Sequence, residues 1–378
     1  MDFRFTHEQQ MWRDTLDRFM EKEVGREYIR EKEAARAFPE EAYRKVAKQG
    51  WLGLLVPEEL GGLELDPVMY AIFVETISKF SLDFTACFIT SMFTLQNIAT
   101  NGTSDQKEKY VPGFLAGDLR FSVSISEPGA GSDAAAVCTK AVRDGDEWVI
   151  NGNKIWCSGA HHPNTTIVLL ARTSEDRYGG LTTILLPNDT RGIDMKKMPT
   201  IVRKCLGTTE YFLTDVRVPV SNTLGEVGGG WNIIGSHLEL ERMSLAASYV
   251  GNARTALDDT IRYTKDRTQF GKSLSSFQVV KHRMAQDEAE LSAVRLLVYD
   301  AACKLARGEK ALKEVSMAKM LAAEVAFQIA FNGMQSLGGY SQLPEFDMER
   351  YFREAKHGMV GGGAQEIQRS IIAKEMGL

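Results

Sequence analysis

The chain lacks the features that mark a disulfide scaffold, a metal site or a membrane protein. Its five cysteines among 378 residues are scattered and odd in number, without the paired spacing of metal ligands. This number and spacing of cysteines predicts a reduced, cytoplasmic protein without a metal site. No apolar run reaches the roughly 18 residues of a membrane helix, and no leader or signal segment is visible at the start. We therefore expect neither membrane insertion nor targeting.

An excess of charge of one sign is also missing. The chain has 45 Lys and Arg against 50 Asp and Glu, a formal net charge of -5. This weakly acidic balance gives no electrostatic reason to expect nucleic acid or an anionic membrane as a partner. Internal repeats and low-complexity tracts are absent as well. What is present, 44% hydrophobic residues in a long chain, is enough for a large core in two or three packed subdomains.

The spacing of the apolar residues changes twice along the chain. A capping box at Thr6 and Gln9 opens helical patterns that continue to about residue 118. From Phe121 short β-rich runs follow, and Asn151-Gly152 predicts a type I′ hairpin turn between two of them. Long alanine-rich helical patterns return after residue 228. The sequence thus predicts an α+β protein with helical domains at 1–118 and 228–378 around a β domain at 119–227.

The segment Gly129 to Ala134 formally matches the G-x-G-x-x-A dinucleotide fingerprint, which needs a helix directly after it. The strand-like alternation that starts at Val137 argues against that interpretation. The longer string Ser124 to Asp133 resembles instead the signature of the acyl-CoA dehydrogenases. Other segments resemble this family in the same order: Gly50 to Gly53, Pro57 to Gly62, Asn151 to Trp156, Asp215 to Pro219, and Arg267 to Gly271.

This resemblance implies an N-terminal helical domain, a central β-barrel-like domain and a C-terminal four-helix bundle, assembled as a homotetramer around FAD. It implies oxidation of an acyl-CoA thioester to the 2-enoyl-CoA, with electron-transfer flavoprotein as electron acceptor. In that reaction a carboxylate removes the α proton while flavin N5 takes the β hydride. The thioester oxygen needs hydrogen bonds as enolate charge develops.

The closing motif, Gly361 to Arg369, departs from the family because Gly362 stands where the catalytic glutamate is expected. The backbone N–H of Gly362 can still hold the thioester oxygen. The run Leu238 to Arg242 resembles the branch with the base on an upstream helix, such as the isovaleryl-CoA and long-chain dehydrogenases, which assigns the base to Glu241. Apolar neighbours would raise the pKa of an inward-facing Glu241 carboxyl and suit it to this role. Without the resemblance, a surface ion pair would be the better interpretation.

The resemblance also assigns residues to the cofactor and the substrate, position by position. The flavin ring is assigned to Val123, Ser124, Ile125, Ser126, Trp156 and Ser158. The rest of the cofactor, partly across subunits, is assigned to Arg267, Gln269, Phe270, Gln278, Gln335, Gly338, Gly339, Ala364 and Glu366. Substrate or CoA contacts are assigned to Ser132, Glu239 and Arg242. Arginine suits these roles because its guanidinium fork pairs with two phosphate oxygens. Glycine suits them because it lets the backbone approach closely.

Several alternatives stay open at this stage. Ala364 replaces the family's threonine, and His357 and Met359 alter the run before it, so an enoyl-CoA reductase of the same fold is a second candidate. A non-enzymatic flavin-retaining binding protein is a third, of another class. The glycines at 361–363 predict open space beside the reacting carbons, and hence branched or cyclic acyl groups. Alternatively, bulkier neighbours such as Tyr249 or Phe88 fill that space.

Overall fold

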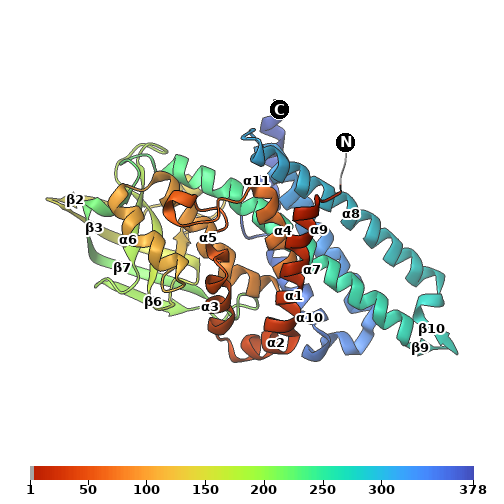
Figure 1. Ribbon diagram of the computed structural model, residues 1–378. Helices are drawn as coiled ribbons and strands as arrows, with labels where there is room; N and C mark the ends of the chain where they lie inside the picture. The colour runs from red at the N-terminus through yellow and green to blue at the C-terminus, as the bar shows by residue number, and fades with distance from the viewer. Residues whose placement is uncertain (1–3) are drawn as a thin grey trace. The chain divides into compact units, whose positions relative to one another are not determined.

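The computed structural model describes residues 4–378, in which the chain forms two compact units (Figure 1). The helical unit comprises the N-terminal residues up to Ala34 together with Asp66–Thr85 and Glu241–Leu378. The sheet unit comprises Ala35–Leu65 and Ala86–Leu240. Each unit combines segments far apart in the sequence. The boundaries expected at residues 118 and 227 stay a prediction.

The helical unit is built from long helices whose starts are encoded locally. The Thr6 side chain accepts from the N–H of Gln9 while the Gln9 side chain accepts from that of Thr6, which confirms the predicted capping box. The Asp66 carboxylate caps the helix that begins at Pro67 by accepting from the backbone N–H groups of Val68 and Met69. The helices are α1 (His7–Phe19), a π-helical turn (Met20–Val24), α2 (Gly25–Ala35), α4 (Pro67–Ile77), α8 (Gln278–Ala306), α9 (Leu312–Leu337), α10 (Met348–His357) and α11 (Gln365–Glu375).

Helix α9 is central to this unit, because α8, α10 and α11 all pack against it. Its buried face consists mainly of alanine and other small or branched residues, which allow close helix packing. Helix α7 (Gly230–Asp266) contributes its residues from Glu241 onward to the same unit. Between Arg4 and Leu378, no helix combines the length and the apolar composition needed to cross a bilayer.

The sheet unit contains one sheet of eight strands with the order β6-β7-β3-β2-β4-β5-β8, and β1 pairs with β4 in parallel. Helices α3 (Glu40–Lys48), α6 (Ser104–Leu115) and most of α5 (Leu82–Asn101) belong to the same unit. The strands are β1 (Arg120–Ser124), β2 (Lys140–Asp144), β3 (Glu147–Ser158), β4 (Thr165–Arg172), β5 (Leu181–Pro187), β6 (Ile193–Lys197), β7 (Thr208–Pro219) and β8 (Thr223–Leu224).

The predicted helical and β-rich zones are confirmed, but two details are wrong. Over the described residues the sheet does not close into a barrel, since β6 and β8 form its ends. Asn151-Gly152 is not a turn: it lies inside β3, which shifts register against β7 between Ile150 and Gly152. The Asn151 amide and Asp215 exchange two hydrogen bonds that hold this bulge. The hairpin turns instead at Gly145, whose φ is 61°.

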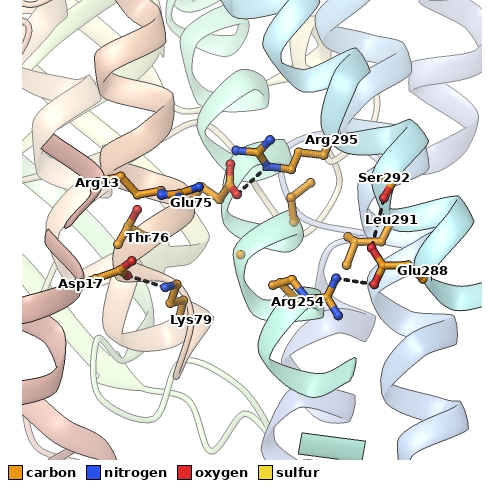
Figure 2. Close-up of a pocket in the computed structure, with 12 residues that line it drawn as sticks. Arg13, Asp17, Glu75, Thr76, Lys79, Arg254, Glu288, Leu291, Ser292 and Arg295 are labelled. Atoms are coloured by element: carbon orange, nitrogen blue, oxygen red, sulfur yellow. Dashed lines mark hydrogen bonds and ion pairs between the residues drawn. The ribbon is translucent and has the colours of Figure 1, made fainter. Parts of the chain in front are cut away.

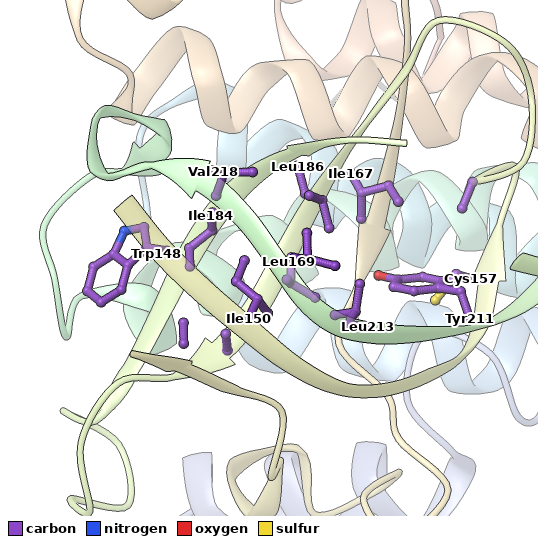
Figure 3. Close-up of a cluster of buried hydrophobic side chains, with 14 residues drawn as sticks. Trp148, Ile150, Cys157, Ile167, Leu169, Ile184, Leu186, Tyr211, Leu213 and Val218 are labelled. Atoms are coloured by element: carbon purple, nitrogen blue, oxygen red, sulfur yellow. The ribbon is translucent and has the colours of Figure 1, made fainter. Parts of the chain in front are cut away.

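A buried cluster on one face of the sheet holds the strands together (Figure 3). Its members alternate along the strands, so apolar residues meet on one face. They include Trp148, Ile150, Ile167, Leu169, Ile184, Leu186, Tyr211 and Leu213. After the glycine-rich segment only a short 3₁₀ turn (Ala134–Ala136) precedes β2. The rejection of the dinucleotide fingerprint is therefore confirmed, because no helix N-terminus follows to hold a pyrophosphate.

Candidate functional site

The loop between α10 and α11 has a backbone that requires glycine. Gly362 and Gly363 have φ of 65° and 92°, in the left-handed region that side chains disfavour. The Gln368 amide donates to both of their carbonyl oxygens, at 3.2 and 3.1 Å. The Nζ of Lys319 also donates to the carbonyl of Gly363, at 2.5 Å. Helices α11 and α9 thus anchor the closing motif.

Glu241 on α7 lies beside this loop. A Cβ atom built on Gly362 would lie 3.8 Å from the Oε1 atom of Glu241 and 3.7 Å from the Cε atom of Lys319. The structure therefore brings together Glu241 and Gly362, the two residues predicted to act at the reacting carbons. The carboxylate of Glu241, on α7, therefore lies close to the place that a side chain at residue 362 would occupy.

The space predicted beside the glycines is filled at this position. A Cβ atom on Gly362 would overlap with Cδ1 of Leu245, which lies one turn after Glu241 on α7. The ring of Tyr249 takes the corresponding place beside Gly358. The expectation of open space at Gly362 was wrong, because α7 packs its own side chain against the loop. The bulkier neighbour at Gly362 is Leu245, which the sequence analysis did not name, and the expected preference for branched or cyclic acyl groups stays a prediction.

The charges near Glu241 are largely hidden from water. Lys319 has 0% of its surface exposed, and Arg242 is buried as well. Burial lowers the pKa of Lys319 to about 8, while the charge of Glu241 opposes this change and that of Arg242 adds to it. Charge interactions are stronger in such surroundings than in water. The site therefore combines the Glu241 carboxylate with two buried cations, Lys319 and Arg242.

The predicted flavin-ring residues lie in the sheet unit, at the ends of β1 and in β3. The N–H of Ile155 donates to the carbonyl of Ser126 at 3.0 Å, so these two segments lie side by side. Trp156 occupies a bulge of β3 with φ of 64°, and 58% of it is exposed. The hydroxyl of Ser124, in contrast, is in the core, where it contacts Cys157 and accepts from Tyr211 at 2.6 Å. Ser124 therefore has only its backbone available for a ligand.

Sequence reasoning did not single out Lys154 and Glu127, which fix this strand end. Lys154 is fully buried, and its Nζ donates to the Ile125 carbonyl and to Glu127, each at 2.9 Å. Glu127 also accepts from the backbone N–H groups of Cys138 and Thr139. The signal available was Glu127 itself, inside the string that resembles the family signature.

A second group of predicted cofactor residues lies on the helical unit. Arg267, Gln269 and Phe270 belong to a hairpin of β9 (Thr268–Gln269) and β10 (Lys272–Ser273), with Phe270 93% exposed at its tip. The Arg267 guanidinium lies 5.8 Å from the ring centroid of Tyr340, next to Gly338 and Gly339. A Cβ atom on either glycine would meet nothing within 4 Å. The structure thus brings the hairpin and this glycine turn together.

An exposed guanidinium, an exposed aromatic face and open backbone have the chemistry that a phosphate-linked aromatic cofactor needs. The residues present therefore fit FAD.

The other predicted positions are more dispersed. Gln278 begins α8, Gln335 lies near the end of α9, and Ala364 and Glu366 lie at the start of α11. Ser132 is exposed in the turn after β1, and Glu239 precedes Arg242 on α7. The cofactor and substrate contacts expected of these residues stay predictions.

A separate cavity of about 300 Å³ lies in the helical unit, between α1, α4, α7 and α8 (Figure 2). Three ion pairs line it: Arg295 with Glu75, Arg254 with Glu288, and Lys79 with Asp17. None of the predicted site residues lies among its lining residues. Because each acidic group that lines it is paired with a basic one, the cavity presents no unmatched acidic group for catalysis.

Comparison with known proteins gives full-length matches. The family models for the N-terminal, middle and C-terminal domains of acyl-CoA dehydrogenase match residues 6–118, 122–216 and 228–377. The 3-(aryl)acrylate reductase of Clostridium sporogenes is 33% identical, over 98% of this chain and 99% of the relative. The caffeyl-CoA reductase-Etf complex subunit CarC of Acetobacterium woodii is 31% identical over 98% of each chain. The solved FAD complex of PigA superposes with a TM-score of 0.95 at 26% identity, covering both chains completely.

Proposed function

Since the chain belongs to the acyl-CoA dehydrogenase family of FAD-dependent enzymes, we propose that it oxidises an acyl-CoA thioester to the 2-enoyl-CoA with Glu241 as the base. One observation carries the assignment: the Glu241 carboxylate lies 3.8 Å from where a side chain at residue 362 would begin. This distance supports a carboxylate acting close to the position from which the family's missing glutamate would act.

In the proposed reaction, Glu241 removes the proton from Cα of the substrate, and the N–H of Gly362 donates a hydrogen bond to the thioester oxygen. Removing a weakly acidic α proton needs both, because the base takes the proton while the donor stabilises the oxygen on which negative charge develops. FAD, when bound, supplies the acceptor for the hydride that leaves Cβ. The anchored loop supports this role for Gly362, because Gln368 and Lys319 already hold the carbonyls of Gly362 and Gly363.

We assign FAD to two sets of residues. The ring would be held by backbone around Ile125 and Ser126 and by Trp156 and Ser158. The distal half would be held by Arg267, Phe270 and the Gly338-Gly339 turn. The high exposure of Phe270 supports a contact made to the cofactor of a neighbouring copy. We propose a homotetramer as the assembly. Electron-transfer flavoprotein is the proposed electron acceptor, because the relative CarC is named as a subunit of a complex with Etf.

The test is Glu241→Gln, which keeps the shape of the side chain and cannot take a proton. We expect kcat with an acyl-CoA and a dye acceptor to fall by about a hundredfold or more, while FAD stays bound. Glu175→Gln, a change at an exposed loop carboxylate, is the matched control and should behave as wild type. Activity of Glu241→Gln within a few-fold of wild type would refute the assignment.

A second candidate is reduction of a 2-enoyl-CoA by the same residues, in which Glu241 in its protonated form delivers a proton to Cα. Two similar proteins named as reductases favour it. Anaerobic assays with acyl-CoA plus an oxidising dye and with enoyl-CoA plus a reduced donor would separate the two directions. A panel that includes straight-chain, branched and 3-aryl thioesters would identify the acyl group.

A further inference from the structure

Lys319 is a buried cation next to the proposed base, and the reaction described above gives it no chemical role. It lies on α9 with 0% of its surface exposed. An ammonium group without water is costly unless it is paired and hydrogen-bonded. Its Nζ donates to the carbonyl of Gly363, at 2.5 Å. This lysine is therefore tied to the closing loop at the residue after Gly362.

The same lysine lies close to Glu241. A Cβ atom built on Gly362 would lie 3.7 Å from the Cε atom of Lys319 and 3.8 Å from the Oε1 atom of Glu241. The charges of two residues, Glu241 and Arg242, shift the pKa of Lys319, and both residues lie on α7. On the loop side, the Gln368 amide of α11 donates to the same Gly363 carbonyl as Lys319. The titratable ring of His357, on α10, lies beside Gly361 of this loop. Glu241 is thus the carboxylate whose charge the ammonium offsets.

We propose that Lys319 is a positioning residue for proton transfer, which holds the closing loop by its hydrogen bond and keeps Glu241 ionised by its charge. The inference rests on the proposed function of Glu241. The α proton moves from substrate Cα to the Glu241 carboxylate, and Lys319 keeps its own proton throughout. Removing a cation favours the protonated form of a nearby, partly buried carboxyl group, and a protonated carboxyl group cannot take the α proton.

Three substitutions separate the charge from the hydrogen bond. Lys319→Arg keeps both, Lys319→Gln keeps a donor without the charge, and Lys319→Met keeps neither. Loss of the charge raises the pKa of Glu241, so the acidic limb of the kcat/KM profile should move to higher pH in the Gln and Met variants. We expect a shift of about one pH unit or more, which is a tenfold loss at a pH below the limb. Lys319→Arg should keep the wild-type limb.

Lys313→Met, on a half-exposed position of the same helix, is the matched control and should leave the profile unchanged. A uniform loss of activity in Lys319→Gln and Lys319→Met, with no movement of the limb, would show a structural role only and overturn the proposal. If Lys319→Met does not fold, Lys319→Gln and Lys319→Arg carry the same comparison. Near-normal activity in Glu241→Gln would instead refute the proposed function, so the two failures are distinguishable.

Discussion

The packing of Leu245 against Gly362 leads to a quantitative prediction about the replacement of Gly362 by alanine. The new methyl group has two separate costs. At φ of 65° any Cβ atom is disfavoured by about 1 to 2 kcal/mol. The overlap with Cδ1 of Leu245 requires the core to adjust, which costs about 1 to 3 kcal/mol. We expect Gly362→Ala to lower the free energy of unfolding by roughly 2 to 5 kcal/mol.

A double-mutant cycle separates the two costs. Leu245 is 7% exposed, so Leu245→Ala alone should cost about 2 to 5 kcal/mol through the cavity that it leaves. In the double variant the methyl group introduced at position 362 lies in that cavity, and the overlap disappears. The combined loss should therefore be smaller than the sum of the single losses by about 1 to 3 kcal/mol.

The assay is denaturant unfolding of the four proteins, followed by far-UV circular dichroism. Gly308→Ala is the control for backbone strain, because Gly308 has φ of 70° and a Cβ atom there meets nothing within 4 Å. It should cost about 1 to 2 kcal/mol. Additive losses in the cycle, or a Gly362→Ala loss equal to that of Gly308→Ala, would show that Leu245 does not fill this space.

Three further predictions test other parts of the structure. Asp347 is fully buried, and burial favours its neutral form, but its hydrogen bond with Arg30 and the charges of Arg350, Arg30 and Arg26 hold its pKa below the usual range. Asparagine tolerates the φ of 62° at this position, so Asp347→Asn removes the charge without adding backbone strain. Denaturant unfolding at pH 7 should show that the free energy of unfolding falls by about 3 to 5 kcal/mol. In the wild type this contribution is lost as the pH falls through the lowered pKa, and an Asn variant as stable as wild type at pH 7 would contradict the reasoning. Burial, followed by the charges of Glu33 and Asp83, raises the pKa of Glu354 to about 7. The folded protein then binds the proton more tightly than the unfolded chain, so wild-type stability should fall as the pH rises from about 4.5 to 7. Glu354→Gln should lack that component of the slope, and equal slopes would refute this. Phe270→Ala, at the exposed hairpin tip, should change the free energy of unfolding by less than about 0.5 kcal/mol. Under the proposed assignment it should lower the ratio of flavin to protein absorbance after gel filtration, and undiminished FAD content would count against it.

Local sequence signals predicted the elements that depend on neighbouring residues. The capping box at Thr6 and Gln9 needs only four consecutive residues, and the structure contains it. The change from helical spacing to strand alternation near residue 121 also appears, because each pattern has its own period. The motif resemblance led to the family and to the pairing of Glu241 with the loop at Gly362. The catalytic role of Glu241 stays a prediction.

Tertiary packing decided what the local signals could not. Asn151-Gly152 has turn chemistry, yet pairing with β7 and two hydrogen bonds to Asp215 keep it inside a strand. Gly362 indicated empty space, yet Leu245 from a segment more than a hundred positions away fills it. Lys319 carried no local signal, because burial of its ammonium and its closeness to Glu241 and Gly363 arise only when α7, α9 and the closing loop meet. A sequence pattern specifies the preference of a segment, whereas volume and electrostatic environment depend on residues that only folding brings together.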